Sequence, residues 1–188
     1  MKRTVTTIFS LLFGSLFLYS CESCENPTIT YPTEAETEWL VYEIGDKPVY
    51  KDERDTLIRS YKFLGFLGQN VPGEGISLSD ECMERLDTQV LGEVSDTTGR
   101  YPRLFTYILK RPDSLQVKIA VDNLGDWVLD QNNPTHETLE VDGNVYNNVY
   151  EINADSVKLN SVKTVLFNKE YGFLYVDFYN NKKLTLVR

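Results

Sequence analysis

The sequence predicts an all-β protein, a single antiparallel β-sandwich or small barrel of about 8–10 short strands that follows a signal peptide and a tether. Three observations predict this class. Short segments alternate apolar and polar residues with a period of two, and no long stretch keeps the 3.6-residue period of a helix. Turn-forming residues separate these segments at short intervals. The chain also contains 12 tyrosines and 9 phenylalanines, which favour strands.

The N-terminal residues have the order of a secretory signal. Lys2 and Arg3 supply positive charge, and the apolar run that follows is densest over residues 8–19. This run is shorter than the roughly 20 apolar residues that a membrane-spanning helix needs. We therefore expect residues 1–20 to be removed as a signal peptide, residues 21–38 to form a flexible polar tether and residues 39–188 to form one β domain.

The sequence LYSC at residues 18–21 ends the apolar run and resembles the lipobox of bacterial lipoproteins. The resemblance implies that Cys21 is diacylated on sulfur, becomes the first residue after cleavage and is then acylated on its amino group. Several acyl chains, such as palmitate, would hold one residue stably at a membrane. The protein would then be an outer-membrane lipoprotein of the cell envelope, either periplasmic or surface-exposed. The alternative is an ordinary signal peptide that happens to precede a cysteine.

The charge of the chain limits its partners. The formal net charge is −9, and cleavage after residue 20 removes Lys2 and Arg3 but no acidic residue, which makes it −11. A strongly acidic surface disfavours nucleic acids and anionic membrane faces as partners.

The three cysteines are Cys21, Cys24 and Cys82. If Cys21 carries lipid, Cys24 and Cys82 remain as an even pair in an extracytoplasmic compartment. They could form a disulfide that pins the tether to the domain, or remain as two free thiols. No cysteine and histidine cluster has the spacing of a zinc site, so we predict no metal site.

In the first half of the domain, strands are expected at residues 39–44 and 56–67, although the second segment could contain a short helix. A loop should follow at 69–79. Residues 84–94 alternate with a period of two apart from Leu91. Residues 103–110 and 115–121 should form a hairpin around a turn at Pro112. The most regular amphipathic strand has one apolar face, formed by Leu115, Val117, Ile119 and Val121.

In the second half, a short strand around Trp127 precedes a loop at 131–135. Residues 139–141 and 145–152 flank Asp142 and Gly143, a pair typical of hairpin turns. Residues 162–167, 173–179 and 183–187 should form a closing three-stranded meander.

This C-terminal part carries a second resemblance. FNKEYGFL at residues 167–174, LTL at 184–186 and YNNV at 146–149 are similar to the C-terminal meander of small Bacteroidetes-type lipoproteins. Those are acidic, tyrosine-rich β proteins of uncharacterised function. The resemblance therefore implies a fold and an anchor but no activity.

Catalytic motifs are missing from the sequence. His136 is the only histidine, so Ser/His or Cys/His catalysis would have to use it, and we interpret it as a solvated loop side chain. Asp122, Asp126 and Asp130 could form a glycosidase pair or a cation site, but on a strand or turn they would not share a face. We predict no catalytic residue and no cofactor, and favour a protein that is not an enzyme.

Two kinds of surface feature are candidate functional residues. Trp39, Trp127, Tyr146 and Tyr150 could form a platform on which a sugar ring stacks, although packing in the core is the interpretation that we favour. Four Asp-Ser or Asp-Thr pairs are similar to the acceptor of the general O-glycosylation system in Bacteroidetes. The similarity implies acceptors at exposed turns, and the alternative is that these pairs are ordinary turn residues. The acceptors would be Thr56, Thr97, Ser114 and Ser156.

Three functions follow, in order of preference. The first is a lipid-anchored extracytoplasmic β domain that serves as a non-catalytic binding or structural module for an unidentified protein or glycan. The second is a lipocalin-like barrel that carries a small apolar ligand, lined by strands such as 115–121. The third is a glycoside hydrolase that uses carboxylates.

Overall fold

The computed structural model describes residues 24–52, 57–78, 80, 82–154 and 161–188. In this part of the chain the helical segments are a single turn each, α2 (Glu34–Thr37) and η2 (Glu38–Leu40), and the remaining elements are strands. The prediction of an all-β fold is confirmed. The predicted signal peptide and Cys21 lie outside the described residues.

The strands form one antiparallel meander with a short parallel addition. Strands that follow one another in the sequence pair from β2 to β7 and again from β8 to β12, and β12 pairs with β2 to join the two runs. The described residues form twelve strands: β1 (Thr28–Thr30), β2 (Val49–Asp52), β3 (Leu57–Pro72), β4 (Arg85–Asp96), β5 (Leu104–Arg111), β6 (Ser114–Val121), β7 (Gly125–Leu129), β8 (His136–Val141), β9 (Asn144–Asn153), β10 (Val162–Asn168), β11 (Gly172–Phe178) and β12 (Lys183–Leu186).

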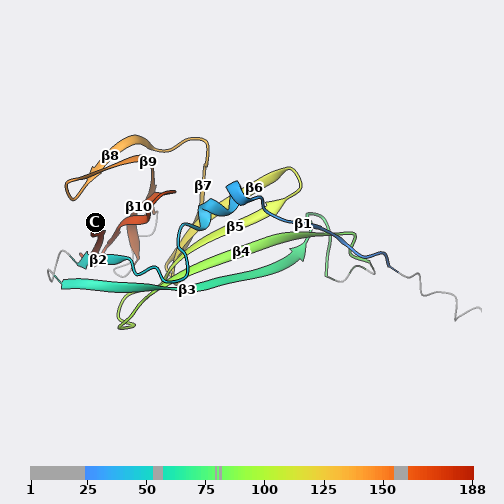
Figure 1. Ribbon diagram of the computed structural model, residues 1–188, viewed down its shortest axis with the longest axis horizontal. Coiled ribbons are helices and arrows are strands. Elements are labelled where there is room, and N and C mark those ends of the chain that lie inside the picture. The colour runs from blue at the N-terminus through green and yellow to red at the C-terminus, as the bar shows by residue number, and fades with distance from the viewer. Residues whose placement is uncertain (1–23, 53–56, 79, 81, 155–160) are drawn as a thin grey trace, which may run out of the picture.

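The sheet is curled, and β8, β9 and β10 lie above the end of β3 that pairs with β2 (Figure 1). β7 and β8 are consecutive in the sequence but stand at the two ends of the sheet. Residues 130–135, which we call the seam loop, connect these two open ends. Among the described residues the curled sheet is therefore open where a barrel would be closed.

β3 extends five residues beyond its predicted end at residue 67, whereas β4 nearly matches its predicted strand at 84–94. β3 joins the two halves of the sheet. Residues 57–60 of β3 pair with β2, whereas Tyr61 to Pro72 pair with β4. A register shift between Phe63 and Gly65 marks a β-bulge, which bends the strand as it passes from one half to the other. The predicted loop at 69–79 begins later than expected, because pairing with β4 keeps the backbone extended as far as Pro72.

The N-terminal region differs from its prediction. Residues 28–38, expected as part of a flexible tether, contain β1, which pairs in parallel with β4, and the turn α2. The predicted strand at 39–44 is wrong, because its first two residues lie in η2. Trp39 and Leu40 are both buried. Consecutive side chains of a strand point to opposite faces, so a helical turn suits two adjacent core residues better.

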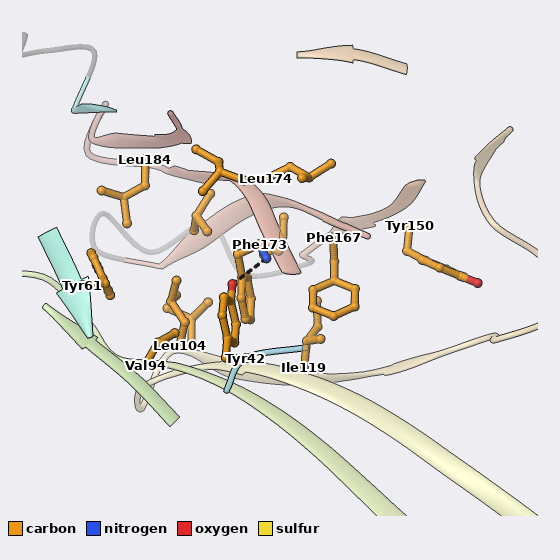
Figure 2. Close-up of a cluster of buried hydrophobic side chains, with 14 of the residues drawn as sticks. Tyr42, Tyr61, Val94, Leu104, Ile119, Tyr150, Phe167, Phe173, Leu174 and Leu184 are labelled. Atoms are coloured by element: carbon orange, nitrogen blue, oxygen red, sulfur yellow. Dashed lines mark hydrogen bonds between the residues drawn. The ribbon is translucent and has the colours of Figure 1, made fainter. Parts of the chain in front are cut away.

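The core lies between the two halves of the curled sheet (Figure 2). Leu104 and Ile119, from the long-stranded half, point toward Phe167 and Phe173 in the other half. Tyr42 extends between them, and its hydroxyl oxygen accepts a hydrogen bond of 3.0 Å from the backbone N–H of Phe173. The rings of Phe167 and Phe173 meet edge to face, with 5.4 Å between their centroids.

The strand proposed to line an apolar lumen is packed into this core. Val117, Ile119 and Val121 of β6 are at most 1% exposed and belong to the same hydrophobic cluster as the aromatic side chains of the opposite half. These side chains stabilise the fold by excluding water.

Candidate ligand-binding site

A surface cavity of about 650 Å³ lies at the seam loop. It is formed where this loop approaches η2, the centre of β9 and the turn between β10 and β11. Its lining consists of two aromatic rings, five carboxamides, one proline and two charged side chains: Trp39, Gln131, Asn132, Pro134, Asn147, Asn148, Tyr150, Asn168, Lys169 and Glu170. We call it the seam cavity.

Trp39 and Tyr150 form the aromatic part of the seam cavity. Their rings meet edge to face at a centroid distance of 5.6 Å, and each side chain keeps only 6–7% of its surface exposed. The Tyr150 hydroxyl donates a hydrogen bond of 2.8 Å to the backbone oxygen of Gln131, which ties β9 to the seam loop. Burial raises the pKa of Tyr150.

The charges near Trp39 compensate one another. The Lys169 ammonium lies 5.3 Å from the centroid of a Trp39 ring and 2.6 Å from a carboxylate oxygen of Glu38. This places a cation over the ring face, where the π electrons attract it. Because Lys169 is paired with Glu38, the cavity presents little net attraction for an anion.

Some carboxamides of the seam cavity already form hydrogen bonds within the fold, whereas others remain available to bind a ligand. Asn168 is structural, because its side chain donates to the Asn147 backbone oxygen and accepts from two backbone N–H groups of the β10–β11 turn. Asn132 and Asn148 are exposed, and their side chains make no hydrogen bond within the described residues. Asn148 has a φ of 52°, a left-handed conformation that asparagine tolerates better than most residues. The site therefore offers two amide groups, each able to donate and accept.

The four predicted platform residues do not form one surface. Trp39 and Tyr150 meet at the seam cavity, but only 6–7% of each side chain is exposed, so they do not present a flat platform. Tyr146 is 1% exposed and packs against Tyr171, which contradicts its role as an exposed ring. Trp127 is partly buried and packs over Gly125. The interpretation that we favour from the sequence, packing in the core, is correct for Trp39, Tyr146 and Tyr150.

His136 is not a loop residue as predicted, since it opens β8. Its Nε2 lies 2.6 Å from a carboxylate oxygen of Glu151 on β9, and this hydrogen bond is the largest cause of the lowered pKa of Glu151. The pair lines a separate groove of about 400 Å³ together with Leu139, Leu166 and Tyr175.

The carboxylates considered for acid–base chemistry each have a partner. Asp122 accepts two hydrogen bonds of 3.0 Å from the Arg103 guanidinium, and Asp126 lies 3.3 Å from the Lys118 ammonium. Asp130 accepts from Asn132 and Asn133 within the seam loop. Their hydrogen-bond and ion-pair partners are those of structural carboxylates. No group of three or more metal-ligating side chains is present in the described part of the chain.

Of the two possibilities for Cys24 and Cys82, the structure contains the disulfide. Their Cα atoms are 5.4 Å apart.

Two of the four predicted O-glycosylation acceptors, Thr97 and Ser114, lie at exposed positions. Thr97 is in the turn after β4 and Ser114 is at the start of β6, so both are accessible as O-glycosylation would require. Thr56 and Ser156 lie outside the described residues. O-glycosylation at all four positions stays a prediction.

Sequence reasoning missed most of the seam cavity. Gln131, Asn132, Asn147 and Asn148 come from segments that the sequence assigned to a loop and a strand without a role. One signal could have found Asn147 and Asn148, because adjacent asparagines inside a predicted strand are unusual. Their approach to Trp39, more than 90 residues away in the chain, depends on the curl of the sheet.

No helix in the described residues is both long enough and apolar enough to cross a membrane. A scan of protein-family models, a search of curated proteins and a search of solved structures each found no match for this chain.

Proposed function

We propose that the protein is a lipid-anchored binding protein of the cell envelope that captures a neutral glycan in the seam cavity. The observation that carries the proposal is the pair of exposed amides, Asn132 and Asn148, which line the same cavity as Trp39 and Tyr150. The anchor would be Cys21, through the acyl chains that the lipobox resemblance implies.

The chemistry of the cavity favours a sugar over other small ligands. Sugar hydroxyls donate and accept hydrogen bonds, as carboxamides do, so the two match without burying a charge. The exposed part of an aromatic ring can pack against the C–H groups of a sugar ring. The formal charge of −9 and the pairing of Lys169 with Glu38 disfavour an anionic ligand.

The other two hypotheses find less support. An apolar-ligand carrier needs a lined lumen, whereas the apolar face of β6 is packed against the opposite half of the sheet. A hydrolase needs two carboxylates that converge on one bond, whereas Asp122 and Asp126 are each paired with a cation.

The test is a glycan-array screen of the mature protein, followed by calorimetric titration of the best ligand. Asn132→Asp and Asn148→Asp replace an amide donor by an acceptor of the same shape. Each should weaken binding about tenfold, the effect of one lost hydrogen bond. Asn181→Asp is the matched control, because Asn181 is also exposed and left-handed, with a φ of 63°, but lies outside the cavity. Equal affinities for all three variants, or no glycan bound by the parent, would refute the proposal.

The anchor is tested separately by labelling cells with a palmitate analogue. The parent chain should be labelled and Cys21→Ala should not, because the acylated sulfur is removed. Labelling that persists in Cys21→Ala would place the lipid elsewhere.

A further inference from the structure

We infer that the tip of the β3–β4 hairpin is the end of the protein that rests on the membrane, and that the Cys24–Cys82 disulfide holds it there. We define the tip loop as residues 73–78, directly after β3. The inference rests on the proposed lipidation of Cys21 and adds to it an orientation and a contact surface.

The chain between the anchor and the folded domain is short. Cys24 is three residues after Cys21 and is bonded to Cys82, which precedes β4. Three residues span at most about 10 Å even when fully extended. Without the disulfide, the first residue held by the sheet would be Thr28, and the corresponding limit would be about 24 Å. The bond therefore shortens the link from the membrane to the protein by more than half.

The N-terminal segment that carries Cys24 is firmly attached to the sheet. The backbone N–H of Thr28 donates a hydrogen bond of 3.0 Å to the oxygen of Glu84, and β1 continues alongside the first residues of β4. The N-terminal strand is thus fixed to the hairpin at the base of the tip loop. The lipid anchor can therefore reach another face of the domain only if β1 separates from β4 or the disulfide is reduced.

The tip loop combines an exposed apolar side chain with acidic neighbours. Leu78 is 80% exposed, although it is apolar and most apolar side chains of its size in this chain are at least partly buried. The loop that presents it is ordered, because the Ser77 N–H donates a hydrogen bond of 2.7 Å to the Asp80 carboxylate. Exposed Glu74 lies within the loop, and exposed Glu84 lies at the start of the returning chain just before β4. These acids oppose deep insertion, so the contact that fits is shallow and with a zwitterionic lipid surface.

This orientation has a consequence for the seam cavity. β1 lies near one end of the long axis of the molecule, whereas β8 and β9 lie toward the other end (Figure 1). Residues of β9 and of the seam loop line the cavity. With the tip loop on the bilayer, the cavity would be held away from the lipid, where a ligand can reach it.

The experiment measures contact with lipid at two positions of the full-length lipidated protein in phosphatidylcholine vesicles with brominated acyl chains. Bromine quenches tryptophan fluorescence at short range. Leu78→Trp should be quenched at least twofold more than the parent, which contains only Trp39 and Trp127. Val145→Trp is the matched control, since Val145 is apolar and 59% exposed but lies on β9, and its quenching should equal that of the parent. Equal quenching of Leu78→Trp and Val145→Trp would overturn the inference.

Two further measurements test the anchor, the orientation and the role of the disulfide separately. Flotation of the parent with vesicles reports the anchor alone, so loss of flotation would overturn the anchor and this inference together. If the parent floats and Leu78→Trp is unquenched, the anchor stands and only the orientation is wrong. In the Cys24→Ser/Cys82→Ser double variant, quenching of Leu78→Trp should fall toward that of Val145→Trp. Unchanged quenching in that variant would show that the disulfide does not hold the tip loop to the membrane.

Discussion

Tyr42 shows how one buried hydroxyl holds the segment after η2 against β2 and β11. Its oxygen accepts a hydrogen bond from the backbone N–H of Phe173 and lies 3.2 Å from the hydroxyl oxygen of Tyr50. Burial raises the pKa of Tyr42 to about 12. The side chain thus stays protonated in the folded protein at pH values where an exposed tyrosine ionises.

Tyr42→Phe should lower the free energy of unfolding by about 1–3 kcal/mol, because the buried N–H of Phe173 would lose its acceptor. Urea denaturation at pH 7 measures this change. Tyr31→Phe is the control, because Tyr31 is exposed and should change stability by less than about 0.5 kcal/mol. Equal stabilities of the two variants would show that the Tyr42 hydroxyl contributes nothing.

The same residue predicts how stability depends on alkaline pH. The folded pKa of Tyr42 lies above the unfolded value of 10.0, so its contribution is fully present below pH 10 and is lost as pH rises toward the folded pKa of about 12. In that interval the unfolded chain releases the proton first, and stability should fall by about 1.4 kcal/mol per pH unit from this group. Denaturation at pH 10 and 11 should show a smaller decrease in Tyr42→Phe than in the parent. The same decrease in both proteins would contradict the assignment.

The close approach of the Tyr42 side chain to the backbone before Phe173 requires a glycine at position 172. Its φ is 78°, and a Cβ atom there would collide with the phenol ring of Tyr42. Gly143 has a φ of 76° but nothing within 4 Å of the corresponding position, which makes it a matched control. Gly143→Ala should cost about 1–2 kcal/mol from backbone strain alone. Gly172→Ala should cost at least about 1 kcal/mol more because of the collision, and equal losses in urea denaturation would exclude it.

At the scale of elements, the short helical segment α2–η2 positions the seam cavity. The Glu36 carboxylate accepts a hydrogen bond of 2.8 Å from the Thr33 N–H, which caps the first turn, and one of 2.8 Å from the Lys110 ammonium on β5. The Lys110 bond is the largest cause of the lowered pKa of Glu36. The carboxylate therefore fixes the segment to the sheet, and with it the ring of Trp39.

Glu36→Ala should lower the free energy of unfolding by about 1–2 kcal/mol and weaken ligand binding in the seam cavity, because the cap and the link to β5 are both lost. Glu36→Gln keeps an acceptor for Thr33 and should lose at most about 1 kcal/mol. Thermal unfolding and calorimetric titration measure the two effects. Glu34→Ala is the control, since Glu34 is exposed in the same turn and its side chain makes no hydrogen bond within the described residues. A similar loss in Glu34→Ala would contradict the role of Glu36.

At the scale of the whole molecule, the fold depends on contacts that join distant parts of the chain. β2 pairs with β12, which brings residues 50 and 186 together. The Cys24–Cys82 disulfide joins residues 58 positions apart and attaches the N-terminal strand to the long hairpin. A cross-link over such a distance removes conformational freedom from the unfolded chain.

Replacement of both cysteines by serine should therefore reduce the free energy of unfolding by about 2–4 kcal/mol without changing the β fold. Circular dichroism during urea denaturation measures both properties. A reducing agent should destabilise the parent by the same amount and leave the double variant unchanged. If reduction affects both proteins equally, the effect does not come from this bond.

Much of the fold could be predicted from local patterns in the sequence. The period of two predicted strands such as β6, and the Asp142-Gly143 pair predicted the β8–β9 hairpin, because alternation and turn preferences act between near neighbours. Local pattern failed at Trp39 and Leu40, where a helical turn replaces the expected strand. It also failed to indicate that β3 reaches Pro72, since that length is set by pairing with β4.

The sequence by itself determined the all-β class, the hairpin turns and the expectation of an anchor at Cys21, because each depends on residues close together in the chain. Only the tertiary structure decided that Trp39 and Tyr150 meet at a cavity and that Cys24 bonds to Cys82. It also decided that Asn132 and Asn148 lie together at the seam loop. The physical reason is that these contacts join segments far apart in the chain, and the curl of the sheet, set by the packing of the core, is what brings them together.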